Sequence, residues 1–297
     1  MTQSFGWKPA LLALAVMAVW GTNFVVIKVG LDALPPLLFA ALRFTLAAVP
    51  VLFLPRPKVT LRDLALYGGL IGVGQFGLMF LAIDGLIAPG LASLLVQVQV
   101  FFTIGLAMRG TGERLARVQW LALALAVAGV GVIVAHSGGA TTVGGVLLVI
   151  VAALCWSLGN MVQRRAGRID MLAFVVWSSL FAVPPLFILS AVFEGPQAIV
   201  TGIGTATLLT WAAVVWQAVG NTMFGYGAWG WLLARYPAGA VAPMTLLVPV
   251  FGMGAAAAIL GEPLPGWKLA AAALIMAGLA VNFMGPRVMA RWWPAPG

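Results

Sequence analysis

Long apolar runs follow one another along almost the whole chain, and the short segments between them hold most of the charged residues. Each run is close to the roughly 20 residues that a helix needs to cross a hydrocarbon core of roughly 30 Å. The runs lie at residues 9–29, 35–54, 64–84, 88–108, 117–135, 143–163, 171–193, 207–233, 238–260 and 267–285. The pattern therefore predicts an all-α integral membrane protein with ten transmembrane helices.

The composition also indicates a membrane protein. Of the 297 residues, 63% are hydrophobic and 8% are charged, and the mean hydropathy is +1.08. So little polar surface cannot cover a water-soluble domain of this size. The first run is too long for a signal peptide and no cleavage signature follows it, so we expect it to be retained. Cys155 lies inside the sixth run and is expected to be a small core residue.

The basic residues are distributed unevenly between the two sides that ten spans create. If the N-terminus is cytoplasmic, thirteen of the 16 Lys and Arg residues lie in cytoplasmic segments, while Lys28 and Lys268 lie on the other side and Arg43 lies within a span. An excess of positive charge marks the cytoplasmic face. We therefore expect a cell-membrane protein with both termini in the cytoplasm. The net charge of +9 follows from this topology and indicates no nucleic-acid partner.

The second half of the chain repeats features of the first. Ala128–Gly129 recur as Ala277–Gly278, and Gly112–Glu113 recur as Gly261–Glu262 at the same spacing. Each half holds five spans, and because five is odd, the second half must enter the membrane from the opposite face. The charge pattern requires the same arrangement. Duplicated, inverted membrane folds place their binding site between the copies, near mid-bilayer, and this favours transport.

We expect the first five-helix repeat to cover residues 1–137 and the second, inverted repeat to cover 138–297. The third and eighth spans are rich in glycine, and small residues four apart, such as Gly68 and Gly72, allow helices to approach closely in lipid. Prolines within spans can kink their helices. The glycines fit either tight static packing or the flexible wall of a moving bundle.

Four segments carry a recognisable pattern: AVWGTNFVVIKVGL and PLLFAALRFTLAAVPVL in the first half, and LLVPVFGMGAAAAILGEPL and AAALIMAGLAVNF in the second. Together they resemble the EamA repeat of the drug/metabolite transporter superfamily. The resemblance implies two inverted five-helix repeats and export of small metabolites, and within the superfamily the chain is most similar to bacterial amino-acid exporters. Two departures make the halves chemically unequal: Gln99 matches Pro249, and Arg43 matches Trp177. A symmetric substrate site is therefore not expected.

Polar and aromatic side chains within apolar spans are the candidates for a substrate pathway, because a polar group in lipid needs a partner or water. The predicted substrate-binding residues are Trp20, Asn23, Gln75, Met79, Gln97, Gln99, Trp156, Asn160, Gln217 and Asn221. Gln163, Trp216, Tyr226 and Trp229 accompany them. Trp156 with Asn160, and Gln217 with Asn221, are four apart and are expected to share a helix face. A hydrogen bond between helices is the alternative for any single amide.

The charged residues leave two roles open for Arg43 and provide no buried carboxylate for a proton relay. A buried guanidinium must find acceptors, so Arg43 either holds the fold or attracts a substrate carboxylate. Because Asp and Glu lie only at span ends or in loops, a proton relay has no titrating carboxylate. Glu113 and Glu262 are expected to cap helices or pair locally, and His136 to be solvated. No metal site or cofactor is predicted.

These features predict a carrier that exports amino acids, aromatic, hydrophobic or otherwise neutral, by alternating access. A cavity of amides, aromatic rings and at most one cation suits an amphipathic zwitterion. The alternatives are an exporter of another metabolite or drug class and a channel-like facilitator. An enzyme would need a nucleophile with a base, paired carboxylates or a metal cluster, and the sequence offers none. The expected partners are a small-molecule substrate and the lipid bilayer, and the sequence does not determine the oligomeric state.

Overall fold

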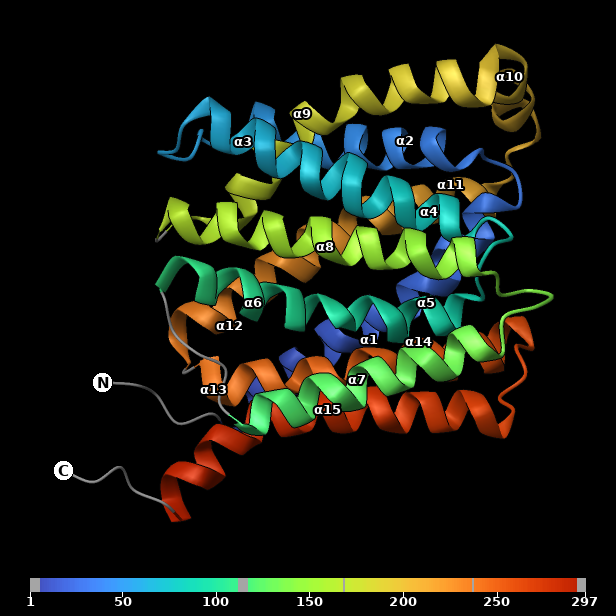
Figure 1. Cartoon of the computed structure of the whole chain (residues 1–297). Helices are drawn as coiled ribbons and strands as arrows, with labels where there is room; N and C mark the ends of the chain where they lie inside the picture. Colours follow the sequence, from blue (N-terminus) through green and yellow to red (C-terminus); the bar gives the residue numbers. More distant parts are fainter. Residues whose placement is uncertain (1–5, 112–116, 168, 237, 293–297) are drawn as a thin grey trace.

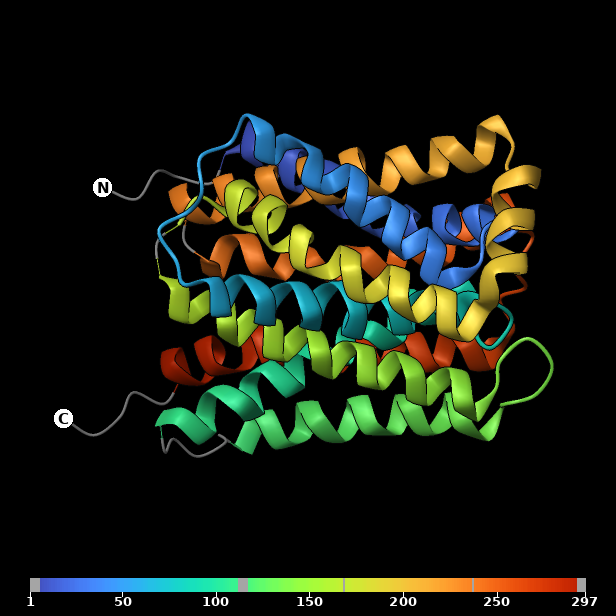
Figure 2. The ribbon, with the colours of Figure 1, turned by 90° about the horizontal axis from the view of Figure 1, so that it is seen from above.

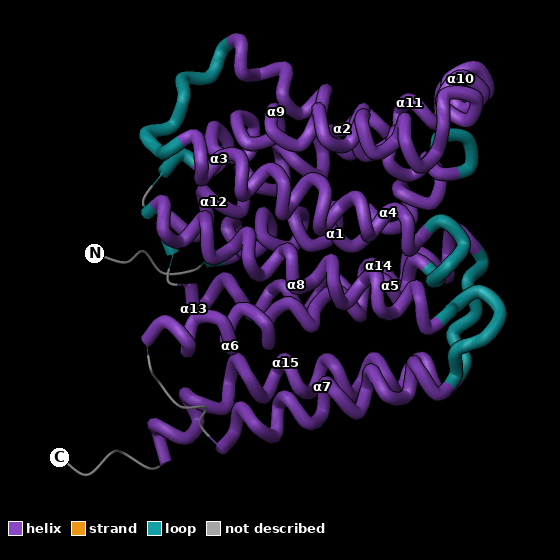
Figure 3. The backbone as a smooth tube through the Cα atoms, turned by 45° about the horizontal axis from the view of Figure 1, so that its top comes forward, coloured by secondary structure: helices purple, strands orange, loops and turns teal. Residues whose placement is uncertain are grey.

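The computed structural model describes residues 6–111, 117–167, 169–236 and 238–292. Within these ranges the regular structure is helical, apart from one isolated bridge between Gly138 and Thr141. Figure 3 shows the helices side by side, with loops gathered at the two ends of the bundle. The predicted role of Glu113 falls outside the described residues.

The helices run along the bundle, and α1 begins at the end where α15 ends (Figures 1 and 2). In chain order they are α1 (Trp7–Leu31), α2 (Pro36–Ala48), η1 (Val49–Leu52), α3 (Leu61–Gly68), η2 (Gly69–Gly77), α4 (Leu78–Ile83), α5 (Pro89–Leu95), η3 (Val96–Val98), α6 (Gln99–Thr111), α7 (Arg117–Ala135), α8 (Val143–Ala166), α9 (Met171–Leu189), η4 (Ser190–Glu194), α10 (Gly195–Thr205), α11 (Leu208–Val215), η5 (Trp216–Phe224), α12 (Gly225–Arg235), α13 (Ala238–Val241), η6 (Ala242–Leu246), α14 (Leu247–Leu260) and α15 (Gly266–Trp292).

Eight helices in the described part of the chain are long and apolar enough to cross a membrane. The predicted second span is a shorter apolar helix, Pro36–Leu52. The predicted eighth span is helical from Leu208 through Arg235 but is not among the eight. The architecture is therefore an all-helical bundle with many apolar spans.

Corresponding helices of the two predicted halves pack against each other. Helix α7 packs along α15 and α2 along α9, and α5 of the fourth span packs along α14 of the ninth. The duplicated Ala-Gly pairs lie in the contact of α7 with α15. A Cβ atom on Gly129 would lie 2.6 Å from Cγ1 of Ile275, and one on Gly278 would lie 2.6 Å from the carbonyl oxygen of Ala122. Glycine at both positions lets the two backbones come together, as small residues do in lipid.

The segment between the seventh and eighth predicted spans is a helix, α10. It follows the π-helical turn η4, and its first residue, Gly195, has a φ of +82°. Glycine adopts this left-handed conformation without a steric penalty, so the chain can turn sharply there. Pro196 then lies in the first turn of α10, where its missing N–H costs nothing. Figure 2 shows residues 195–205, in the yellow-orange part of the colour bar, running across the end of the bundle.

The third and eighth predicted spans each contain a nine-residue π-helical segment, η2 (Gly69–Gly77) and η5 (Trp216–Phe224). The sequence predicted regular helices there. A π-helix closes its hydrogen bonds five residues apart rather than four. π-Helical turns are frequent at functional sites. They occupy matching positions in the two halves.

Gly68 and Gly72 lie against α9, as their spacing predicted. A Cβ atom on Gly68 would collide with the carbonyl oxygen of Ser178, and one on Gly72 would collide with Cβ of Ala182. The contact partners are themselves small and four residues apart. The close approach predicted for this pair of glycines is confirmed.

We expect Gly68→Ala to lower the melting temperature of the detergent-solubilised protein. The added methyl group has no space, and overpacking of this kind costs about 1–3 kcal/mol. Gly69→Ala is the matched control, because no atom lies within 4 Å of the position its Cβ would take and alanine is the better helix former by up to about 1 kcal/mol. Equal melting temperatures for the two variants would contradict the packing described here.

Two carboxylates from the second half cap helices of the first half, at the end of the bundle where α1 ends. Glu194 accepts hydrogen bonds from the backbone N–H groups of Leu37 (2.5 Å) and Leu38 (3.0 Å) in the first turn of α2. Glu262 accepts one from the N–H of Gly90 in α5 (3.0 Å). A negative charge at a helix N-terminus is stabilising. The capping predicted for Glu262 is confirmed, and the two contacts join the halves.

Candidate functional site

A cavity of about 640 Å³ lies between the helices. This is within the usual range of about 300–1,000 Å³ for small-molecule sites. Its walls come from both halves of the chain, chiefly from α1, α6, α8 and α12. Further lining residues come from η2, α4, η3, α9, η5, η6, α14 and α15. Both π-helical segments, η2 and η5, therefore face the same cavity.

Nine of the ten predicted substrate-binding residues line this cavity. They are Trp20, Asn23, Gln75, Met79, Gln97, Gln99, Trp156, Asn160 and Asn221. Gln217 does not line it and is fully buried instead. Asn221, four residues later in η5, lines the cavity although Gln217 does not. In the α-helix α8, Trp156 and Asn160 do share the lining face.

Several of the lining amides bind one another or the backbone across helices. Asn160 of α8 donates its Nδ2–H to Oε1 of Gln99 in α6 (3.4 Å). Thr103, in the same helix as Gln99, donates its hydroxyl to the same oxygen (3.2 Å). Gln97 donates from Nε2 to the carbonyl oxygen of Thr245 (2.9 Å). These amides thus form hydrogen bonds between helices, which was the alternative role considered for any single amide. They also line the cavity.

Other polar atoms in the lining have no partner. The side chains of Asn23 and Gln75 are 4% and 5% exposed, and their carbonyl oxygens lack a hydrogen-bond donor among the described residues. The carbonyl oxygen of Asn282 in α15 also lacks a donor there. A buried acceptor left unpaired costs about 1–3 kcal/mol. The side chains line the cavity, but the oxygens themselves are buried, so a ligand donor reaches them only after the side chains turn.

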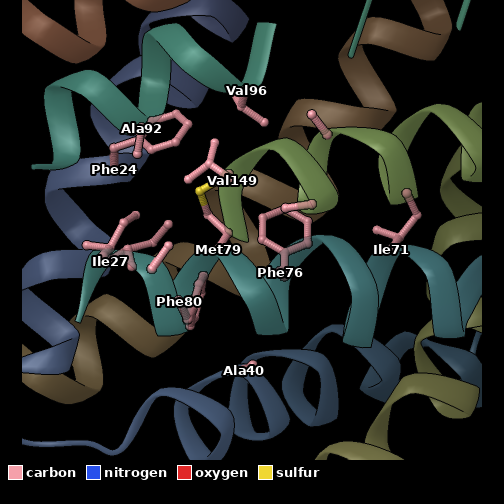
Figure 4. Close-up of a cluster of buried hydrophobic side chains, with 14 of the residues drawn as sticks. Phe24, Ile27, Ala40, Ile71, Phe76, Met79, Phe80, Ala92, Val96 and Val149 are labelled. Atoms are coloured by element: carbon pink, nitrogen blue, oxygen red, sulfur yellow. The ribbon is translucent and has the colours of Figure 1, made fainter. Parts of the chain in front are cut away.

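The inner part of the cavity is apolar. Figure 4 shows Phe76 and Met79 projecting from one face of the η2–α4 helix, whereas Phe80 projects toward Ala40 of α2. Phe76 and Met79 line the cavity together with Phe24, Ile27 and Val96. All five residues are buried, and together they form an apolar surface at the inner end of the cavity.

The other end of the cavity reaches the surface where α8 and α12 end. Arg164 and Leu233 line this end, and both side chains are exposed. Residues that the sequence reasoning did not select include Arg164, Thr103 and Asn282. Arg164 lies one turn after Asn160 on the same helix face, and this spacing is a signal that could have identified it. The sequence had placed it in a cytoplasmic loop.

Arg43 lies outside the cavity lining and is completely buried. Its Nη2–H donates to the hydroxyl of Thr222 (2.7 Å), which joins α2 to η5. Nε and Nη1 have no hydrogen-bond partner among the described residues. The guanidinium carbon lies 3.8 Å from the ring centre of Phe76 and 4.7 Å from that of Phe44, distances at which cation–π attraction is favourable. Phe76 itself lines the cavity, so Arg43 supports a wall residue in this conformation.

We expect Thr222→Val to destabilise the protein by about 2–3 kcal/mol or more. The variant keeps the side-chain shape but removes the acceptor of Arg43, and leaving a buried charged donor unpaired carries a large desolvation penalty. Thr45→Val is the control, because the Thr45 hydroxyl bonds only to the Ala41 carbonyl oxygen of its own helix (2.8 Å). Thermal unfolding in detergent measures both variants. Similar melting temperatures would show that the Arg43–Thr222 bond adds little.

Many apolar helices around a cavity of this size, lined by amides and aromatic rings, define a multi-pass membrane protein built like a transporter. The chain belongs to the EamA-like transporter family, whose model matches residues 7–135 and 143–284.

Individual relatives cover almost the whole chain. It is 44% identical over 288 residues to a protein of Salmonella typhimurium named "Probable amino-acid metabolite efflux pump", with 95% of this chain and 96% of that protein covered. A protein of the same name from Escherichia coli K12 is 42% identical over 287 residues, with 94% and 96% covered. A solved crystal structure matches with a TM-score of 0.63 at 21% sequence identity, over 95% of this chain and 98% of that one, and so shares the fold.

Proposed function

We propose that this protein exports amino acids from the cytoplasm by alternating access, with aromatic, hydrophobic or other neutral amino acids as substrates. The observation that carries the proposal is the chemistry of the cavity. Its inner end is apolar, its middle presents amides and aromatic rings, and no Asp or Glu is among its described lining residues. An amphipathic zwitterion fits this surface, and the names of the two enterobacterial relatives point to the same class of substrate.

The proposed ligand contacts follow from the unpaired groups. After their side chains turn toward the cavity, the carbonyl oxygens of Asn23, Gln75 and Asn282 would accept hydrogen bonds from the substrate ammonium group. The inner apolar surface would hold the substrate side chain. The nine lining residues named above are proposed to bind substrate. Gln217 and Arg43 lie behind the wall, and for them we propose a structural role.

The proposed topology is ten transmembrane helices in two inverted repeats, residues 1–137 and 138–297, with both termini cytoplasmic. Two separate matches to one family model support the duplication. The packing of corresponding helices against each other, as in α7 with α15, fits a two-fold axis between the halves. Reporter fusions after Glu113 and after Glu262 would fall on opposite sides of the cell membrane under this topology. Reporters on one side would overturn it.

Purified protein in liposomes tests the function. Vesicles preloaded with an unlabelled amino acid should take up the same labelled compound by exchange, at a rate that saturates with concentration. A panel of the standard amino acids identifies the preferred class. Saturable flux of another metabolite with none for any amino acid would overturn the substrate class. Flux that does not saturate would favour a channel-like facilitator.

A further inference from the structure

One face of α8 forms a continuous strip along the cavity, from the interior to its open end. Trp156, Asn160, Gln163 and Arg164 all line the cavity, and their spacing places them on one side of the helix. The strip thus changes along the helix from an aromatic ring through two amides to a guanidinium. Arg164 is the single formally charged residue among the described residues that line the cavity.

The charge of Arg164 is not neutralised by any described neighbour. Neither of the two ion pairs in the described ranges includes it, and no described carboxylate lines the cavity. Its side chain is exposed at the end where α8 stops. A cation at the mouth of a cleft with low-dielectric walls raises the local concentration of anionic groups there. A guanidinium also matches the geometry of a carboxylate, because it can donate two parallel hydrogen bonds.

The neighbouring Arg165 serves as a comparison for two general explanations of the charge on Arg164, the helix dipole and the membrane topology. Both arginines lie in the last turn of α8, where a positive charge favours the helix dipole. Both also count toward the positive charge expected on the cytoplasmic side. Arg165, however, lines a different surface pocket, together with Arg56 and Lys58. The helix dipole and the topology therefore explain the charge on Arg165 as well as on Arg164, but they do not explain why Arg164 alone of the two lines the cavity.

We propose that Arg164 captures the carboxylate of the substrate at the cytoplasmic mouth of the cavity and so selects solutes with a free carboxyl group. The inference rests on the proposed function. Arg164 forms a charge-assisted pair with the entering carboxylate, while the apolar side chain of the solute leads toward Phe76 and Met79. Amide and aromatic groups beyond the mouth then replace this contact as the solute moves inward. Arg164 acts on entry and affinity, and the apolar interior selects the side chain.

Inverted membrane vesicles, which expose the cytoplasmic face, provide the test. The probes are labelled phenylalanine, or another amino acid where the wild type moves it faster, and the carboxamide of the same compound. The variants are Arg164→Gln, Arg164→Lys and the control Arg165→Gln. Initial rates are measured against concentration at low and high salt.

We expect Arg164→Gln to raise the KM for the amino acid about tenfold with little change in maximal rate, and to leave carboxamide uptake undiminished. Arg164→Lys should recover part of the loss, and Arg165→Gln should match the wild type. The KM of the wild type should rise with salt, because screening weakens an exposed charge interaction, and that of Arg164→Gln should not.

Three results would overturn the inference. If Arg164→Gln and Arg165→Gln behave alike, general surface charge explains both arginines. If Arg164→Gln impairs the amino acid and its carboxamide equally, Arg164 shapes the mouth rather than binding the carboxylate. In both cases wild-type transport shows that the proposed function stands. If the wild type moves none of the amino acids, the proposed function fails and the inference fails with it.

Discussion

Trp156→Ala should reduce amino-acid transport at least about tenfold at substrate concentrations below KM. Trp156 lines the cavity on α8 and supplies a large ring surface for an amphipathic ligand. Aromatic anchors in binding sites commonly contribute 2 kcal/mol or more on truncation, and about 1.4 kcal/mol already corresponds to a factor of ten in affinity. Because the ring borders an existing cavity, its removal enlarges that space, and the fold should survive.

Trp216→Ala is the matched control for this prediction. Trp216 is 40% exposed and does not line the cavity, although it belongs to η5 like Asn221. The rate of exchange in liposomes is normalised to the amount of folded protein, which gel filtration in detergent determines. Wild-type transport by Trp156→Ala, or an equal loss in both variants, would remove Trp156 from the proposed binding site.

Glu262→Gln should destabilise the protein by about 3–5 kcal/mol, the cost of removing one partner of a buried ion pair. Glu262 pairs with Lys268 at 2.8 Å, and their side chains are 8% and 7% exposed. Its other oxygen accepts the hydrogen bond from Gly90 at the start of α5. Glutamine keeps the size but leaves the Lys268 ammonium buried without a counter-charge. The lost stability concerns a contact that joins the two halves of the chain.

The exposed pair of Lys28 and Asp32 offers the control. These side chains lie 3.3 Å apart and are 38% and 68% exposed. Surface pairs of this kind contribute about 0–1 kcal/mol, so Asp32→Asn should leave the melting temperature in lipid nanodiscs nearly unchanged. The double variant Glu262→Gln with Lys268→Met should recover part of the loss, because it removes the unpaired charge. A shift for Glu262→Gln no larger than that for Asp32→Asn would contradict the prediction.

The sequence predicted most of the polar cavity-lining residues because the medium around these helices is lipid. In lipid, a polar side chain cannot face the hydrocarbon, so amides inside apolar runs must point toward other helices or an internal space. Asn23, Gln75 and Asn160 are examples, and each lines the cavity. The same reasoning applied to Gln217 places it inside the protein, which is correct, but it does not distinguish the cavity from the packed interior.

The sequence by itself determined the all-helical membrane character and the interior position of the polar groups. Both depend on the composition and on the length of the apolar runs, which the thickness of the lipid bilayer imposes directly. The tertiary structure decided the rest. Asn221 joins the cavity lining whereas Gln217 does not, Phe76 contacts Arg43 and lines the cavity, and Arg164 at the end of α8 is part of the lining. Helix rotation and hydrogen-bond register arise from packing between segments far apart in the chain, so no local pattern encodes them.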